Sequence, residues 1–197
     1  FHAYLFETMH DAMVAGSQLM ISSMRPAVIR LYDEASTARI IKRVLNIDRK
    51  GAYLVFGFDG PEKIVDLEME EACKICERTS KEDLGTEAGQ SWWKNRYKFF
   101  YPPYMFQLPQ AFGTLDTVAT FANIENVYRA MKRVIEEQFP VARYIGHFSH
   151  WYEWGCMLYA RFIVDRAPDD PHEAVQLHNR IWDACLRAAM KEGGLLN

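Results

Sequence analysis

Three segments of the chain have the same order, in which an apolar strand passes through a short turn into a long helix. These segments span 52–78, 117–138 and 155–192. Two further apolar runs, at 143–152 and 155–164, are separated by so few residues that they predict a β-hairpin. Alternating strands and helices combined with a direct hairpin favour an α+β fold, with helices covering an antiparallel sheet. A ferredoxin-like arrangement, duplicated so that two units share a sheet, fits this order.

The other elements follow from local spacing and turn signals. Apolar residues at helical intervals in the first 25 residues predict a helix that ends before Pro26. Later segments predict strands at 27–32, 52–58 and 117–121, and helices at 39–45, 61–78, 89–100, 123–138 and 170–192.

Composition limits the classes of partner. The 197 residues are 49% hydrophobic and 25% charged, enough apolar material for one compact domain or two small ones. A net charge of -3 argues against binding nucleic acid through bulk charge. No apolar stretch approaches the roughly 20 residues that cross a bilayer, so we expect a soluble chain. Because the sequence begins with Phe1 and ends after Gly193-Gly194, we expect a piece of a longer protein.

The four cysteines are too few and too scattered for a disulfide framework, which favours the cytoplasm or another reducing compartment. Cys73 and Cys76 have the spacing of half a zinc site, but they lie within a helical pattern. We interpret them as ordinary helix cysteines with one or both side chains in the core, and we expect no metal site.

The usual phosphate loops, serine elbow and zinc helix motifs are absent from the sequence. Polar residues inside predicted strands are therefore the candidates for chemistry, because buried polar groups are costly unless they are paired or used. Arg30 is the first. Its guanidinium would project from a strand and suits a phosphate or carboxylate, or a structural ion pair with Asp33 or Glu34.

The hairpin carries the second group of candidates. Alternation along its second strand places Tyr159 and Arg161 on the same face. A phenol beside a guanidinium can pass a proton or bind an oxyanion, although aromatic hairpins also serve simply as core. His147 and His150 would point to opposite faces unless a bulge intervenes, so they make a poor pair of metal ligands.

The densest aromatic block precedes a Pro-Pro pair. It comprises Trp92, Trp93, Arg96, Tyr97, Phe99, Phe100, Tyr101 and Tyr104. Such a block can stack bases, but it equally forms the wall of a ligand pocket or a domain interface. The net acidity of the chain favours the second interpretation.

Five motifs in order give the chain a family resemblance. They are the Arg25-Pro26 run through Arg30-Leu31 to Asp33, Phe56-Gly57-Phe58-Asp59-Gly60, Gly85 to Gly89 with Gln90-Ser91-Trp92, His150-x-Tyr152-x-x-Gly155-x-x-Leu158-Tyr159, and Gly193-Gly194. Together they resemble the C-terminal half of the vanillyl-alcohol-oxidase-type FAD-linked oxidases, in particular the branch of alkyldihydroxyacetonephosphate synthase and its microbial relatives.

The resemblance implies an α+β cap that binds substrate over a flavin held by an N-terminal FAD-binding domain. Residues 1–25 would be a leading helix or connector from that absent domain, and 26–197 the cap, truncated at its C-terminal end. Arg30 would support flavin and substrate, Tyr159 would act in acid/base chemistry, and Arg161 and His150 would lie nearby at the substrate. A peroxisomal location would follow for a eukaryotic ether-lipid enzyme.

The implied cofactor is FAD, and the implied substrate is small and anionic or lipid-like. We also expect that the full protein can form a homodimer, and that the fragment alone is inactive. A second family arginine is missing near Pro102-Pro103, where Arg96 or Arg161 could substitute. The family's His-His-Gly stretch lies beyond Asn197.

Two alternatives remain open from the sequence. The first is a flavin-dependent D-2-hydroxyacid dehydrogenase or an alcohol oxidase. The dehydrogenases carry GHxGDGNxH, which Gly146-His147 begins but which the residues after Phe148 do not continue. The second is a ferredoxin-like ligand-binding or assembly domain without catalytic activity.

Overall fold

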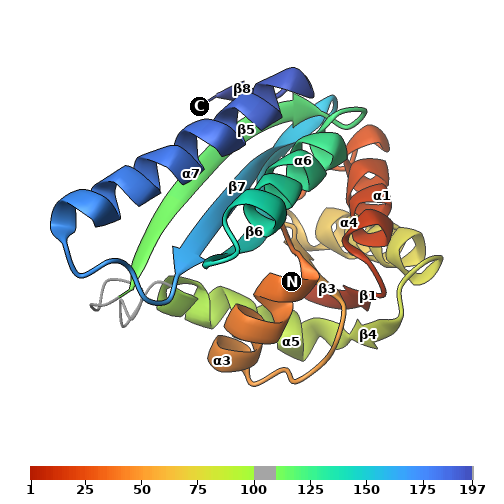
Figure 1. Cartoon of the computed structure of the whole chain (residues 1–197). Helices are drawn as coiled ribbons and strands as arrows, with labels where there is room; N and C mark the ends of the chain where they lie inside the picture. Colours follow the sequence, from red (N-terminus) through yellow and green to blue (C-terminus); the bar gives the residue numbers. More distant parts are fainter. Residues whose placement is uncertain (100–109, 197) are drawn as a thin grey trace. The chain divides into compact units, whose positions relative to one another are not determined.

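The computed structural model of the chain describes residues 1–99 and 110–196 (Figure 1). The chain divides into two compact units. Unit 1 consists of Phe1–Phe99 and His147–Trp154, and unit 2 consists of Phe100–Gly146 and Gly155–Asn197. Strand β6 (Ala142–Tyr152) therefore contributes its first half to unit 2 and its second half to unit 1.

Unit 1 has a βαββαβ chain order followed by a further helix. Its elements are β1 (His2–Phe6), α1 (Met9–Ile21), β2 (Val28–Tyr32), α2 (Glu34–Ser36), the π-helical turn η1 (Thr37–Ile41), α3 (Lys42–Leu45), β3 (Ala52–Gly57), α4 (Glu62–Glu77), β4 (Glu82–Leu84), α5 (Gly85–Asn95) and the 3-10 turn η2 (Arg96–Phe99). The strand order is β4-β1-β3-β2, and the second half of β6 pairs with β2. All of these registered pairs are antiparallel, which is the ferredoxin-like arrangement.

Helices cover both faces of the unit 1 sheet. Tyr4 and Leu54 lie opposite each other on the face that packs against α1 and α4. The other face carries α5, where the Tyr53 hydroxyl donates a hydrogen bond to the Ala88 carbonyl at 3.4 Å. Helix α5 approaches so closely that a Cβ on Gly89 would lie 2.6 Å from the backbone nitrogen of His2. Every residue of β3 is consequently buried.

Unit 2 repeats the βαββαβ order. Its elements are β5 (Ala111–Thr120), α6 (Ile124–Gln138), the first half of β6, β7 (Gly155–Val164), α7 (Pro171–Lys191) and β8 (Leu195–Leu196). The strand order is β6-β7-β5-β8, so the third strand again lies next to the first. Helix α7 begins as expected, because Asp170 caps the backbone nitrogen of His172 and Pro171 occupies the first turn.

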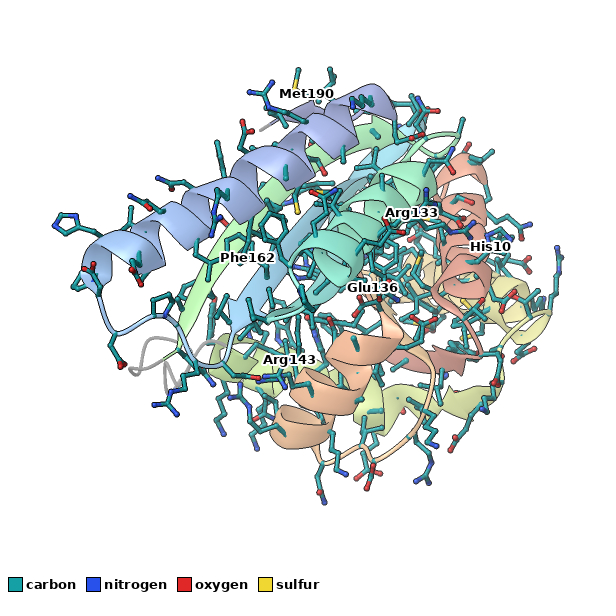
Figure 2. All side chains as sticks on the ribbon, in the orientation of Figure 1. His10, Arg133, Glu136, Arg143, Phe162 and Met190 are labelled. Carbon is teal, nitrogen blue, oxygen red and sulfur yellow. The ribbon has the colours of Figure 1, made fainter. Side chains whose placement is uncertain are left out.

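Both described helices of unit 2 lie on one face of its strands. Phe162 of β7 contacts His178 of α7 with ring centroids 5.1 Å apart, beneath the helix in Figure 2. Helices α6 and α7 also meet at the sulfur of Cys185, which lies 3.9 Å from the Met131 carbonyl. A Cβ on Gly113 would lie 2.3 Å from the Phe162 ring, so glycine permits this packing.

The structure confirms the predicted α+β fold with an antiparallel sheet, including its duplicated ferredoxin-like form and the hairpin of β6 and β7. The expected N-terminal helix is confirmed only over Met9–Ile21, because residues 2–6 form strand β1. Cys76 is buried within α4 and Cys73 is half-buried, as expected of helix cysteines. Among the described residues, no helix is long and apolar enough to cross a membrane.

Candidate functional site

Arg30 lies in the middle of β2, where it pairs with Val55 of β3. Alternation places it on the same face as Tyr32, opposite the buried Ile29 and Leu31. Its side chain is half-buried, and Nη1 donates a hydrogen bond to the Ile29 carbonyl at 2.9 Å. Burial lowers the pKa of Arg30 from its ordinary value, an effect that Tyr32 partly opposes. A strand thus holds a partly desolvated guanidinium in place.

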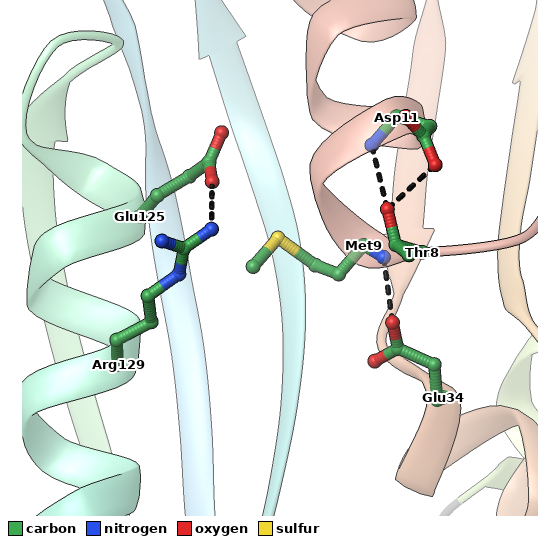
Figure 3. A network of polar contacts seen from close by, with 6 residues as sticks. All are labelled: Thr8, Met9, Asp11, Glu34, Glu125 and Arg129. Carbon is green, nitrogen blue, oxygen red and sulfur yellow. Dashed lines mark hydrogen bonds and ion pairs between the residues drawn. The ribbon is translucent and has the colours of Figure 1, made fainter. Parts of the chain in front are cut away.

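The two carboxylates that the sequence offers as partners for Arg30 are used elsewhere. Asp33 accepts a hydrogen bond from the backbone nitrogen of Ser36 at 2.7 Å and caps α2. Glu34 accepts one from the backbone nitrogen of Met9 at 2.7 Å, at the start of α1 (Figure 3). Among the described residues, no carboxylate forms an ion pair with Arg30. The structural ion pair considered from the sequence is therefore not formed.

An aromatic cluster fixes the strand position next to Arg30. The indole nitrogen of Trp92 donates a hydrogen bond to the Tyr32 hydroxyl at 3.0 Å. The Tyr32 ring stacks on Phe99 and on His147, with centroids 5.6 Å and 5.4 Å away. Tyr32 is therefore held from several directions, which limits how far β2 and Arg30 can move.

Tyr159 and Arg161 lie on β7 in unit 2, on the face opposite Leu158 and Phe162. The guanidinium carbon of Arg161 lies 4.7 Å from the centroid of the Tyr159 ring. Arg161 is only 4% exposed, whereas Tyr159 is half-buried. The structure therefore brings these two predicted residues together on the face that α6 and α7 leave uncovered.

Asp116 lies beside this pair and is not among the residues predicted from the sequence. It lies directly opposite Tyr159 in the register of β5 and β7. Burial raises the pKa of its carboxyl, and the charge of Arg161 partly opposes that effect. The predicted strand began at Thr117, so Asp116 fell outside it. Recognising that Phe112, Thr114, Asp116 and Val118 alternate with buried positions would have placed it on this face.

His150 belongs to unit 1 and interrupts the alternation of β6. Phe148 pairs with Leu31, and Trp151 contacts Gly16 of α1, so these residues three apart both face the packed side. The extra residue is accommodated at His150, whose φ is +48°. Its imidazole is exposed, with Nδ1 3.1 Å from the Ser149 hydroxyl. The simple alternation that put His147 and His150 on opposite faces therefore does not hold.

Arg96, considered as a substitute for the missing arginine, lies at the surface of unit 1. Its guanidinium carbon lies 3.6 Å from the centroid of the Trp93 ring and 4.3 Å from that of Tyr97. Phe100, Tyr101, Pro102, Pro103 and Tyr104 lie outside the described residues. In the part of the chain that is described, no group of three or more His, Cys, Asp or Glu side chains could hold a metal ion.

Arg30 and His150 lie in unit 1, and Tyr159, Arg161 and Asp116 lie in unit 2. The prediction that Arg30 and Tyr159 line one surface therefore joins two units, and it stays a prediction. Within each unit, the polar residues identified from the sequence lie on strands or at a strand irregularity.

Two curated relatives are alkyldihydroxyacetonephosphate synthases. The protein from Dictyostelium discoideum is 25% identical over 189 residues, which cover 82% of this chain and 31% of that protein. The protein from Trypanosoma brucei brucei is 23% identical over 200 residues, which cover 86% of this chain and 32% of that protein. The chain thus spans about a third of the length of these relatives.

Solved structures show the same fold. A structure of alkyldihydroxyacetonephosphate synthase matches with a TM-score of 0.82 and 21% identity, covering 100% of this chain and 40% of that one. The 4-ethylphenol oxidase from Gulosibacter chungangensis matches with a TM-score of 0.75 and 13% identity, covering 99% of this chain and 44% of the oxidase. The family model described as "FAD linked oxidases, C-terminal domain" matches residues 2–197. The chain therefore belongs to the FAD-linked oxidase family, as a C-terminal domain.

Proposed function

We propose that this chain is the substrate-binding part of a longer FAD-dependent enzyme that resembles alkyldihydroxyacetonephosphate synthase. In this proposal the complete enzyme exchanges the acyl group of an acyl dihydroxyacetone phosphate for a fatty alcohol, without net redox change. The proposal rests on the family match and on the similarity to two synthases.

One structural observation carries the proposal, namely the half-buried guanidinium of Arg30 that has no carboxylate partner among the described residues. Desolvation penalises an isolated charge, so such a group is expected where an anion binds. Arginine also binds phosphate and carboxylate groups through two parallel hydrogen bonds. We assign Arg30 to an anionic group of the substrate or of the flavin.

FAD, bound mainly by another domain of the same protein, would supply the electron-accepting ring system. Arg30 is the residue of this chain that fits the cofactor, because a guanidinium held on a strand can bind an electron-rich or anionic edge of that ring system. The FAD-binding domain is therefore the partner that we propose.

Tyr159 would handle a proton near the reacting carbon of the substrate. The Arg161 guanidinium lies against its ring, so both groups would contact the same substrate. Arg161 would also bind the substrate from its buried position on β7. His150 would contribute an exposed imidazole to the substrate side of unit 1. We also propose that the enzyme works in a reducing compartment, which is the peroxisome if the enzyme is eukaryotic. We further propose that it forms a homodimer.

The test is a product analysis of the full-length protein with FAD, palmitoyl dihydroxyacetone phosphate and 1-hexadecanol. We expect an alkyl ether product and released fatty acid, with no consumption of an electron acceptor. Reduction of an acceptor by an alcohol or a hydroxy acid, without ether product, would instead establish an oxidase or dehydrogenase. Absence of both reactions in protein that retains FAD would favour a binding domain without catalytic activity.

A further inference from the structure

The carboxyl group of Asp116 has an unusual environment in the middle of β5. Its Oδ1 atom is buried, yet it has no hydrogen-bond partner among the described residues. Buried acceptors in folded proteins are nearly always satisfied, by protein, water or ligand, because an unsatisfied group carries its full desolvation cost. The position therefore needs an explanation that the described part of the fold does not provide.

The neighbours of Asp116 are the residues already assigned to the substrate. Tyr159 lies directly opposite it in the strand register, and Arg161 is close enough for its charge to affect the carboxyl. All three side chains project from the face of unit 2 that α6 and α7 leave uncovered. Thr114, which pairs with Arg161, completes a polar stretch across the two strands.

The charges at this position restrict what a ligand can present to Asp116. An anionic group would be repelled by the carboxylate, and a cationic group would be repelled by Arg161. A neutral hydrogen-bond donor meets neither penalty and satisfies the buried Oδ1 atom. Among neutral donors, a hydroxyl group also fits beside Tyr159, because the phenol can exchange a hydrogen bond with its oxygen.

We propose that Asp116 is a third polar residue of the substrate site and that its carboxyl binds the hydroxyl group of an alcohol substrate. The inference rests on the proposed function only in taking the Tyr159 face as part of the substrate site. In this arrangement Arg30 would bind the anionic group of one substrate, and Asp116 would bind the hydroxyl group of the other.

The experiment measures binding of two ligands to the full-length protein with FAD by isothermal titration calorimetry. The first, 1-octanol, presents a hydroxyl donor, and the second, octyl methyl ether, keeps an apolar chain and an acceptor oxygen but has no donor. We expect the wild-type protein to bind octanol about tenfold more tightly than the ether, the effect of one satisfied buried acceptor. The Asp116→Ala variant should lose this preference through weaker octanol binding, with ether binding unchanged.

The matched control is Asp183→Ala, which removes an exposed carboxylate of α7 that pairs with Arg187 one turn away. It should keep the tenfold preference. The Asp116→Asn variant keeps the shape of the side chain, which guards against a folding defect in the alanine variant. Because a neutral amide accepts a weaker hydrogen bond than a carboxylate, its preference should fall at least threefold.

Three results would overturn the inference. They are a wild-type protein that does not prefer octanol, Asp116 variants that keep the full preference, and an equal loss of both ligands, which would indicate a structural role. Failure of the proposed function gives a different result, since the ether product would be absent while the octanol preference still depended on Asp116.

Discussion

Strand β3 of unit 1 and strand β7 of unit 2 hold the same position in the same βαββαβ arrangement, but their surroundings differ. Helices α1 and α4 cover one face of the unit 1 sheet and α5 the other, and every residue of β3 is buried. In unit 2 the described helices cover one face of β7, and Tyr159 and Arg161 lie on the other. The residues of β7 are buried as well, except for the half-buried Tyr159. The two units thus differ in helix cover, because α5 after β4 covers the second face of the sheet in unit 1 and no described helix covers that face in unit 2.

The difference shows that two units with the same topology can present different side chains on their sheet faces. In unit 1 helices on both faces are held by contacts such as the hydrogen bond from Trp92 to Tyr32, and Arg30 on β2 is a polar exception. In unit 2 the helix-covered face of β7 carries apolar side chains such as Leu158 and Phe162. The opposite face is also mostly buried, but it carries the polar side chains of Tyr159 and Arg161. Function lies in the side chains that a face presents, which topology alone does not determine.

The largest effect that we expect tests the helix-covered face of unit 2. Replacing Phe162 by alanine removes a fully buried ring beneath α7, which should destabilise unit 2 by about 3–5 kcal/mol. Native-state hydrogen exchange of the β7 amides in the full-length protein measures this loss. The control is Val118→Ala on the opposite face, which should cost about 1 kcal/mol. Equal losses at the two positions would contradict the assignment of faces.

A smaller effect tests how α5 closes the second face of unit 1. The Tyr32→Phe change removes the acceptor of the Trp92 indole nitrogen and leaves a buried donor unsatisfied, at a cost of about 1–3 kcal/mol. Hydrogen exchange of the α5 and β2 amides reports it. A double-mutant cycle with Trp92→Phe separates the hydrogen bond from ring packing. A coupling energy near zero between the two changes would show that this bond does not hold α5.

The smallest effect concerns the pH dependence of unit 2. Burial raises the pKa of Asp116 in the folded state, so the folded state binds its proton more tightly than the unfolded state. The contribution of Asp116 to stability is therefore greatest below its unfolded pKa and declines as pH rises through its folded pKa. Relative to wild type, the Asp116→Asn variant should gain stability as pH is raised from about 3.5 to 7. Thermal unfolding across this range measures the difference, and the opposite trend would contradict the account.

The elements predicted best were those with strong local signals. Asp170 and Pro171 marked the start of α7, and the short gap between 152 and 155 marked the hairpin. Strand β1 was missed because residues 2–6 have no turn signal of their own and are stabilised by pairing with β3, a contact distant in sequence. Strand β4 was missed for the same reason, since it has three residues and is stabilised by pairing with β1.

Some residues of the candidate site could be predicted from the sequence, and others could not. The pairing of Tyr159 with Arg161 followed from alternation within one strand, which sequence reveals directly. Asp116 depends on the register between β5 and β7, which only the folded sheet supplies. The partners of Asp33 and Glu34 were likewise unpredictable, because α1 and α2 had to be placed before their backbone donors could be identified.

The most direct test of the central claim compares Arg30→Lys and Tyr159→Phe with wild type in the full-length enzyme, with FAD content measured for each. We expect kcat/KM for ether formation to fall by an amount equivalent to about 2–5 kcal/mol in each variant, with FAD occupancy unchanged. The loss reflects a bidentate anion contact in the first case and a proton transfer in the second. Turnover near that of wild type in both variants, at full FAD occupancy, would remove these residues from the reaction and contradict the account.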